Sequence, residues 1–295
     1  MSADAEFFTR RPRPALRPYL DRYVGYREAG NPPSVHRGLP SPQLTLIFTL
    51  DDPLIMAAHP DPAQRPGVFD ALVGGLHTRP ALITNPGRQS GVQLSVNPLG
   101  ARALLGLPAG EIAEHDFHVE DLLGPAFVAR LRERIRHAAT WPERLDIIEE
   151  LLVQRLDADA DFRPEVRHVW QALLASGGAA DVAGLAKSVG WSTRHLSAEF
   201  RTEFGVGPKA FGRLVRFRRV VAQLPRATQA GLSLAEVAAA HGYYDQSHLA
   251  AEFRALAGCP PTVWMAEEFR NFQVHWGQEE SESSHDEYDD WYDQY

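Results

Sequence analysis

The sequence predicts an α+β protein, in which a small β-rich, barrel-like N-terminal domain with helices is followed by an all-α domain with two helix-turn-helix motifs. Three observations lead to this prediction. Short apolar runs separated by Pro, Gly, Asn and Asp clusters indicate strands in the first part of the chain. Farther along, apolar residues recur at helical spacing. A segment in the last third of the chain is repeated. The chain of 295 residues is also long enough for two domains, each with its own hydrophobic core.

The β-rich part contains runs that suit a small antiparallel barrel or sandwich. The candidate strands are Gln43–Leu50, Leu54–Ala58, Ala71–Gly75, Ala81–Thr84 and Gly91–Asn97. An earlier segment, Leu16–Tyr26, places Leu16, Leu20, Tyr23 and Val24 at helical offsets. This spacing predicts a helix lying on the sheet.

Two amphipathic helices are expected around residues 125–156, with a break near Thr140-Trp141-Pro142. Their apolar stripes fit two interpretations: they cover the sheet, or they form the seam of a homodimer. The run of acids and prolines at Asp157–Pro164 predicts a hinge. We therefore expect a regulatory, effector-binding or dimerisation domain over residues 1–165, a helical domain over 166–275 and an acidic disordered tail over 276–295.

The charge of the chain is unevenly distributed. The formal net charge is −8, and the eight acids of residues 276–295, which contain no Lys or Arg, account for all of it. In contrast, the window 185–226 holds nine basic and two acidic residues, a net charge of +7. Such an asymmetry indicates contact with a polyanion, or else a solvated basic face.

Other classes of protein find little support. A single cysteine, Cys259, excludes an internal disulfide and the usual cysteine-based zinc clusters. The scattered histidines show no metal-ligand pattern apart from His115-x-x-His118, and no catalytic triad, phosphate loop or paired-acid motif is present. We expect no enzyme activity, no cofactor and no metal. With no signal peptide and no apolar stretch of ~18 residues, the predicted location is the cytoplasm and not a membrane.

An internal repeat is the most specific feature of the sequence. Ala198-Glu199-Phe200-Arg201 recurs as Ala251-Glu252-Phe253-Arg254 at an offset of 53, whereas Leu185-Ala186 and Gly190 match Val237-Ala238 and Gly242 at an offset of 52. The second copy therefore has one extra residue in its turn.

Each copy has the ingredients of a helix-turn-helix. A short helix with a small alanine at the helix contact leads to a glycine that can adopt positive φ, and an N-cap follows, Ser192 in one copy and Asp245 in the other. The next helices, about 193–204 and 246–257, are the candidate recognition helices. Their inward faces carry Leu and Phe, and their outward faces are small, polar or basic, as entry into a major groove requires.

A continuous helical pattern over Phe211–Leu224, which Pro225 is expected to end, connects the two copies. Arginines on this connector and on the recognition helices are predicted to contact phosphates without reading sequence. They are Arg201, Arg213, Arg216, Arg219 and Arg254. Arg194 is the strongest candidate for a direct base contact.

The repeat resembles the DNA-binding domain of the AraC/XylS family of transcription regulators over about residues 180–266. GWSTRHLSAEFRTEFGVGP is similar to the family's first helix-turn-helix, GYYDQSHLAAEFRALAGCPP to its second and PKAFGRLVRFRRVV to its linker helix. The resemblance implies reading of two adjacent major grooves by one domain. Carried over by position, the base-contacting places are Thr193, Arg194, Ser197, Ala198, Gln246, Ser247, His248 and Ala251.

The implied partners are double-stranded DNA, a small-molecule effector at the N-terminal domain, a second copy of the chain and, for an activator, RNA polymerase. The chain departs from the family in two places, and the first departure favours an alternative function. Ala198 and Ala251 replace long polar or basic side chains, and Pro260-Pro261-Thr262-Val263-Trp264 replaces the usual final signature. The alternatives are a protein- or ligand-binding regulatory module with weakened DNA affinity and an effector-sensing anti-regulator, besides an enzyme with a barrel-like N-terminal domain.

Overall fold

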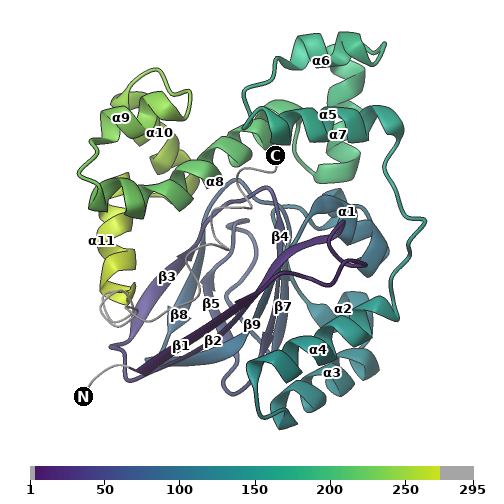
Figure 1. Cartoon of the computed structure of the whole chain (residues 1–295), viewed down its shortest axis with the longest axis vertical. Helices are drawn as coiled ribbons and strands as arrows, with labels where there is room; N and C mark the ends of the chain where they lie inside the picture. The colour runs from purple at the N-terminus through teal and green to yellow at the C-terminus, as the bar shows by residue number, and fades with distance from the viewer. Residues whose placement is uncertain (1–3, 273–295) are drawn as a thin grey trace. The chain divides into compact units, whose positions relative to one another are not determined.

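The computed structural model describes residues 4–272 and divides the chain into two compact units (Figure 1). The first comprises Met1–Phe162 and Arg201–Val206, and the second comprises Arg163–Phe200 and Gly207–Tyr295. An antiparallel β-rich unit precedes a helical one, which confirms the predicted α+β class. The predicted tail, 276–295, lies outside the described residues.

The first unit is built on two open antiparallel sheets. A six-stranded sheet has the order β1-β2-β9-β4-β7-β10, and a four-stranded sheet has the order β3-β8-β5-β6. The strands are β1 (Asp4–Arg10), β2 (Leu20–Ala29), β3 (Ser34–Gly38), β4 (Leu44–Thr49), β5 (Leu54–Ala58), β6 (Gly67–Phe69), β7 (Ala71–Gly74), β8 (Ala81–Asn85), β9 (Arg88–Val96) and β10 (Asp116–His118). The five predicted strands correspond to β4, β5, β7, β8 and β9.

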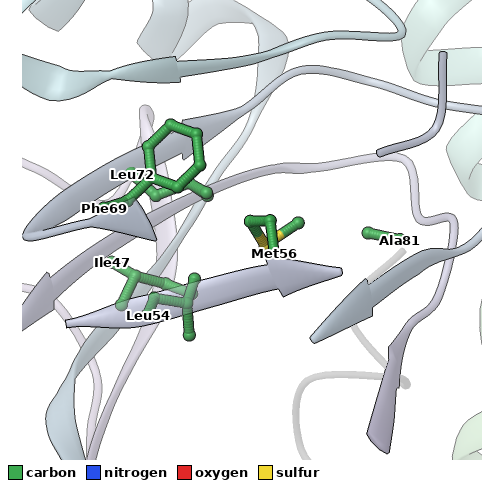
Figure 2. Packing of buried hydrophobic residues seen from close by; sticks show 6 residues of the cluster. All are labelled: Ile47, Leu54, Met56, Phe69, Leu72 and Ala81. Atoms are coloured by element: carbon green, nitrogen blue, oxygen red, sulfur yellow. The ribbon is translucent and has the colours of Figure 1, made fainter. Parts of the chain in front are cut away.

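The two sheets enclose an apolar core. Ile47 of β4 and Leu72 of β7 lie opposite Leu54, Met56 and Phe69 of the smaller sheet, together with Ala81, as Figure 2 shows. All six side chains are less than 7% exposed. Because both sheets are open, the domain is a sandwich that resembles a barrel without closing into one.

Helices cover the other face of the six-stranded sheet. Tyr23, Leu94, Leu46 and Val73 lie in register across four strands of this face, and all are buried. A Cβ added at Gly25, two residues along β2 from Tyr23, would lie 2.5 Å from the ring of Trp141. The helix that begins at Trp141 therefore packs directly on the sheet, and only glycine leaves room for the indole.

The helices of the first unit follow strand β9, with β10 inserted between the 3₁₀ turn and α2, and they include the two predicted amphipathic helices. They are α1 (Pro98–Gly100), a π-helical turn (Ala101–Leu105), a 3₁₀ turn (Ala109–Ile112), α2 (Val119–Leu123), α3 (Pro125–His137) and α4 (Trp141–Val153). Thr140 caps α4 in a capping box with Glu143, which explains the break at this point. Leu131 and Ile135 of α3 and Leu145 of α4 are fully buried, so the apolar stripes cover the interior.

The amino-terminal arm, residues 4–13, is held against α4 by hydrogen bonds to a buried carboxylate. Glu149 is fully buried and accepts hydrogen bonds from the Arg10 guanidinium at 2.6 Å and from the backbone N–H of Arg13 at 2.7 Å. Arg10 and Arg13 also pair with Asp146, and these contacts hold the pKa of Asp146 below its usual value. The charge of Glu149 is thus compensated from the arm.

The predicted helix over Leu16–Tyr26 is wrong, because residues from Leu20 onward form strand β2. The register of β2 against β9 shifts between Leu20 and Arg22. This bulge inserts an extra residue, so Leu20 and Tyr23 are buried three positions apart in a strand. The apolar residues of this strand are therefore spaced as they would be in a helix.

The second unit is all-helical over its described residues. Its helices are α5 (Pro164–Ala175), α6 (Val182–Ser188), α7 (Thr193–Phe204, whose last turn groups with the first unit), α8 (Pro208–Gln229), α9 (Leu234–Ala240), α10 (Gln246–Ala257) and α11 (Pro261–Phe272).

The prediction that Pro225 ends the connecting helix is wrong, since α8 continues to Gln229. Proline removes the hydrogen bond to the carbonyl of Val221. Leu224 and Ala227 remain buried on either side of it, and this burial holds the helix together across the gap. With 22 residues, α8 is about 33 Å long.

Candidate nucleic-acid interface

The first helix-turn-helix consists of α6 and α7. Gly190 has a φ of 73°, and the backbone N–H of Trp191 returns to the carbonyl of Ala186 at 2.9 Å, which closes α6. The hydroxyl of Ser192 accepts from the N–H of His195 at 3.1 Å, so Ser192 is the predicted N-cap of α7. Ala186 is buried, as a close helix contact requires.

The second helix-turn-helix, α9 and α10, repeats this arrangement. Gly242 has a φ of 70°, and the N–H of Tyr243 bonds to the carbonyl of Ala238 at 3.0 Å. The carboxylate of Asp245 accepts from the N–H of His248 at 2.7 Å, which confirms Asp245 as the N-cap of α10. The sequence repeat is therefore a structural repeat.

Helix α8 holds both motifs through aromatic pairs. Phe211 meets Phe200 of α7 edge to face at 5.6 Å between ring centroids, and Phe217 meets Phe253 of α10 in the same way at 4.9 Å. Six residues correspond to about 600° of helical rotation, so the two phenylalanines lie on different sides of α8. The connector therefore presents the two recognition helices on separate faces.

The proposed base-contacting side chains lie on the outside of the second unit. Every one of them is exposed except Ser197, which is half-buried. The apolar side chains of the same helices are fully buried, namely Leu196, Phe200, Leu249 and Phe253. The exposed side chains are Thr193, Arg194, Ala198, Gln246, Ser247, His248 and Ala251. The inward and outward faces are those expected from the sequence.

The five arginines predicted to contact phosphates fall into two groups. Arg201 and Arg254 are exposed on α7 and α10. Arg213, Arg216 and Arg219 of α8 are half-buried.

Each of these three α8 arginines contacts another part of the second unit. Arg213 pairs bidentately with Glu252 of α10, both contacts being 2.9 Å, and the hydrogen bond raises the pKa of Arg213. The Arg216 guanidinium lies over the ring of Tyr243 at 5.5 Å. An added Cβ at Gly177 would collide with the guanidinium of Arg219. The pairing of Glu252 with Arg213 is not predictable from the sequence, because the two residues lie 39 positions apart and Glu252 belongs to the repeated Ala-Glu-Phe-Arg segment.

A second polar arrangement lies in the first unit. His59 is fully buried in its side chain and shares a 2.6 Å hydrogen bond between its Nδ1 and the carboxylate of Asp116. The side chain of Gln64 bonds to both the N–H and the carbonyl of Asp116, and Phe69 packs edge-on against His59. The Nε2 atom of His59 is buried without a hydrogen-bond partner in the structure.

His115 and His118 are used separately in the first unit. His115 pairs with Asp61 at 3.1 Å, and His118 stacks on Phe69 at 4.5 Å between centroids. Within residues 4–272, no group of three or more His, Cys, Asp or Glu side chains is arranged to hold a metal ion. Over the same range, no helix has both the length and the apolar character needed to cross a bilayer.

Two helix-turn-helix motifs joined by one helix define a DNA-binding type of domain. Residues 185–267 match the sequence family described as a helix-turn-helix domain, and residues 9–118 match a domain of unknown function, DUF6597. The first match shows a helix-turn-helix domain at residues 185–267, the segment in which the sequence resembles the AraC/XylS family of transcription regulators. No curated protein matches the sequence significantly.

The solved structures to which the chain is similar have low sequence identity and TM-scores below 0.5. Two structures of ToxT from Vibrio cholerae, the second bound to an unsaturated fatty acid, are 7% and 8% identical at TM-scores of 0.47 and 0.43. Each alignment covers 90% of this chain and 99% or 95% of ToxT. The AraC-like transcriptional activator CuxR is 14% identical at a TM-score of 0.27, over 74% of this chain and 96% of CuxR. The function proposed below therefore rests on the helix-turn-helix match and on the geometry of the second unit.

Proposed function

We propose that the chain binds DNA sequence-specifically and regulates transcription by inserting α7 and α10 into two adjacent major grooves. The observation that carries this proposal is the matched pair of recognition helices on α8. Each buries its Leu and Phe residues and exposes small, polar or basic side chains. Such a face admits a helix to the groove and offers donors and acceptors to base edges.

In this proposal the residues have distinct roles. The base-reading places are Thr193, Arg194, Ser197, Ala198, Gln246, Ser247, His248 and Ala251. Arg201 and Arg254 contact phosphates from the exposed ends of the recognition helices, and Arg216 and Arg219 do so from α8. Arg213, which is already paired with Glu252, acts as a positioning residue that fixes α10 on α8.

The test begins with the full chain and a pool of random duplex DNA, from which bound fragments are selected and sequenced. The proposal predicts an enriched motif with two half-sites about one helical turn apart. Arg194→Ala should then weaken binding by about 5- to 150-fold, which corresponds to about 1–3 kcal/mol, and relax preference at one position of the first half-site. A chain that retains no DNA, or an Arg194→Ala variant with unchanged preference, would contradict these assignments.

The second candidate function is a regulatory module with weakened DNA affinity that binds a protein or a ligand. Ala198 and Ala251 favour it, because both are exposed at base-reading places and have no polar atom to offer. Ala198→Arg and Ala251→Arg distinguish the two functions. If direct readout at these places is merely reduced, each variant should bind DNA more tightly. If the face serves a protein or a ligand, DNA binding should stay weak in both variants.

Regulation is assigned in the same proposal to the first unit, which would take a small-molecule effector in the cytoplasm. A homodimer, and RNA polymerase as a partner of an activator, remain predictions. The apolar stripes of α3 and α4 are buried within the unit, so they do not supply a dimer seam. Sedimentation at micromolar concentration measures the oligomeric state directly, and a monomer would remove the homodimer from the proposal.

A further inference from the structure

The two helix-turn-helix motifs differ by one residue, and the structure shows which residue it is. Trp191 and Tyr243 are equivalent, since their backbone N–H groups bond to the carbonyls of Ala186 and Ala238. One motif then continues directly to its N-cap, Ser192. In the other, Tyr244 intervenes before the N-cap Asp245. Tyr244 is therefore the residue added to the second turn.

The side chain of Tyr244 lies almost entirely in solvent. It is 93% exposed, whereas the adjacent Tyr243 is 4% exposed. The other large apolar side chains that are exposed in the described chain reach at most 55%. An isolated exposed apolar residue is ordinary. A nearly fully exposed aromatic ring one residue before the N-cap of a recognition helix, however, contributes nothing to the core of its own domain.

The backbone of Tyr244 organises one of the proposed base-reading residues. Its N–H donates to Nδ1 of His248 at 3.3 Å, and the His248 ring packs edge to face on Tyr243 at 5.3 Å. Because Nδ1 accepts this hydrogen bond, the neutral imidazole carries its proton on Nε2. The inserted residue thus turns His248 into a donor for the acceptors of the major groove, such as N7 and O6 of guanine.

We propose that Tyr244 contacts DNA and is specific to the second motif: its hydroxyl donates a hydrogen bond to a backbone phosphate at the edge of the groove that α10 enters, while its N–H orients His248. This inference rests on the proposed function. Tyr244 lies before the N-cap, whereas the base-reading places Gln246, Ser247 and His248 follow it, so the phenol lies outside the row that faces the bases. Tyrosine is one of the neutral side chains that donate to phosphate oxygens.

The test compares the full chain with Tyr244→Ala and Tyr244→Phe on the selected DNA site and on unrelated duplexes, by fluorescence anisotropy at several salt concentrations. Both variants should lose about 5-fold in affinity, as expected for one hydrogen bond. The loss should be equal on all sequences, and the salt slope should not change, because a neutral donor releases no counterion. Val263→Ala, at an exposed position of α11, is the matched control and should bind like the unaltered chain.

Three results would overturn the inference: unchanged affinity of Tyr244→Ala, unchanged affinity of Tyr244→Phe, or a loss that depends on sequence. If the unaltered chain binds no DNA at all, the proposed function fails. In that case NMR of the histidine ring nitrogens still tests the second half of the inference. Neutral His248 should carry its proton on Nε2, and a proton on Nδ1 would refute the orienting role of Tyr244.

Discussion

Replacement of Arg213 by alanine tests whether this arginine positions α10 or contacts DNA. The side chains of Arg213 and Glu252 are 38% and 11% exposed, so the substitution leaves a largely buried carboxylate without its partner. Exposed ion pairs contribute at most about 1 kcal/mol, whereas breaking a buried pair costs about 3–5 kcal/mol. Since solvent screens the guanidinium in part, we expect the free energy of unfolding of the second unit to fall by about 1–2 kcal/mol.

The same variant should have little effect on the salt dependence of DNA binding. Glu252 already neutralises Arg213, so few counterions are released through this arginine. The slope of log K against log [salt] should therefore stay at its original value. Arg254→Ala is the matched comparison, because Arg254 lies exposed on the same helix as Glu252. Its loss should reduce the magnitude of the slope by about 0.9.

A double-mutant cycle completes the test. Arg213→Ala, Glu252→Ala and the double variant are unfolded in urea, and the interaction energy is obtained from the three changes in stability. A coupling of about 1 kcal/mol or more supports the positioning role. A coupling below about 0.3 kcal/mol, or an Arg213→Ala salt slope that falls as far as that of Arg254→Ala, would refute the reasoning.

Three further predictions concern the second motif, each measured by urea unfolding of the full chain. Gly242→Ala should lower the free energy of unfolding by about 1–2 kcal/mol, because φ at this position is 70° and an alanine there strains the backbone. An added Cβ meets no atom within 4 Å, so steric collision does not contribute. An unchanged urea midpoint would contradict this prediction. Asp245→Ala should lose about 1 kcal/mol with the N-cap, and Asp245→Asn should retain most of it. Burial, and to a smaller extent the charge of Arg219, lower the pKa of His241 below its usual 6.5. The stability that the neutral ring contributes above pH 6.5 should therefore be lost as the pH falls through the lowered pKa. His241→Gln should remove this pH dependence of the unfolding free energy, and a variant with the same pH profile as the unaltered chain would disprove the prediction.

Local features of the second unit were predictable because short segments of sequence determine them. The N-caps Ser192 and Asp245 lie next to the glycines that end the preceding helices. The buried faces of α7 and α10 follow from a regular 100° step. Even the added residue in the second turn was visible as a change of offset, although only the hydrogen bonds of the turn identify it as Tyr244.

The features that escaped prediction depend on residues far apart in the chain. His59 and Asp116 are separated by 57 positions, and Arg213 and Glu252 by 39, so no local pattern reveals either pair. The sequence of strand β2 predicts a helix because the bulge in this strand changes the period of burial. Pro225 was expected to end α8 because helix propensity was considered without the burial of Ala227 beyond it.

The contact between Glu149 and the amino-terminal arm determines where the chain can be shortened or extended. Removal of residues 1–13 would take away both the Arg10 guanidinium and the Arg13 N–H, and the carboxylate of Glu149 in α4 would lose these donors. The loss would weaken the packing of α4 on the sheet, although the deleted residues contain little of the core. An affinity tag placed before residue 4 leaves this contact intact, and the rate at which a protease cuts after Arg10 should report how often residues 4–13 detach from α4.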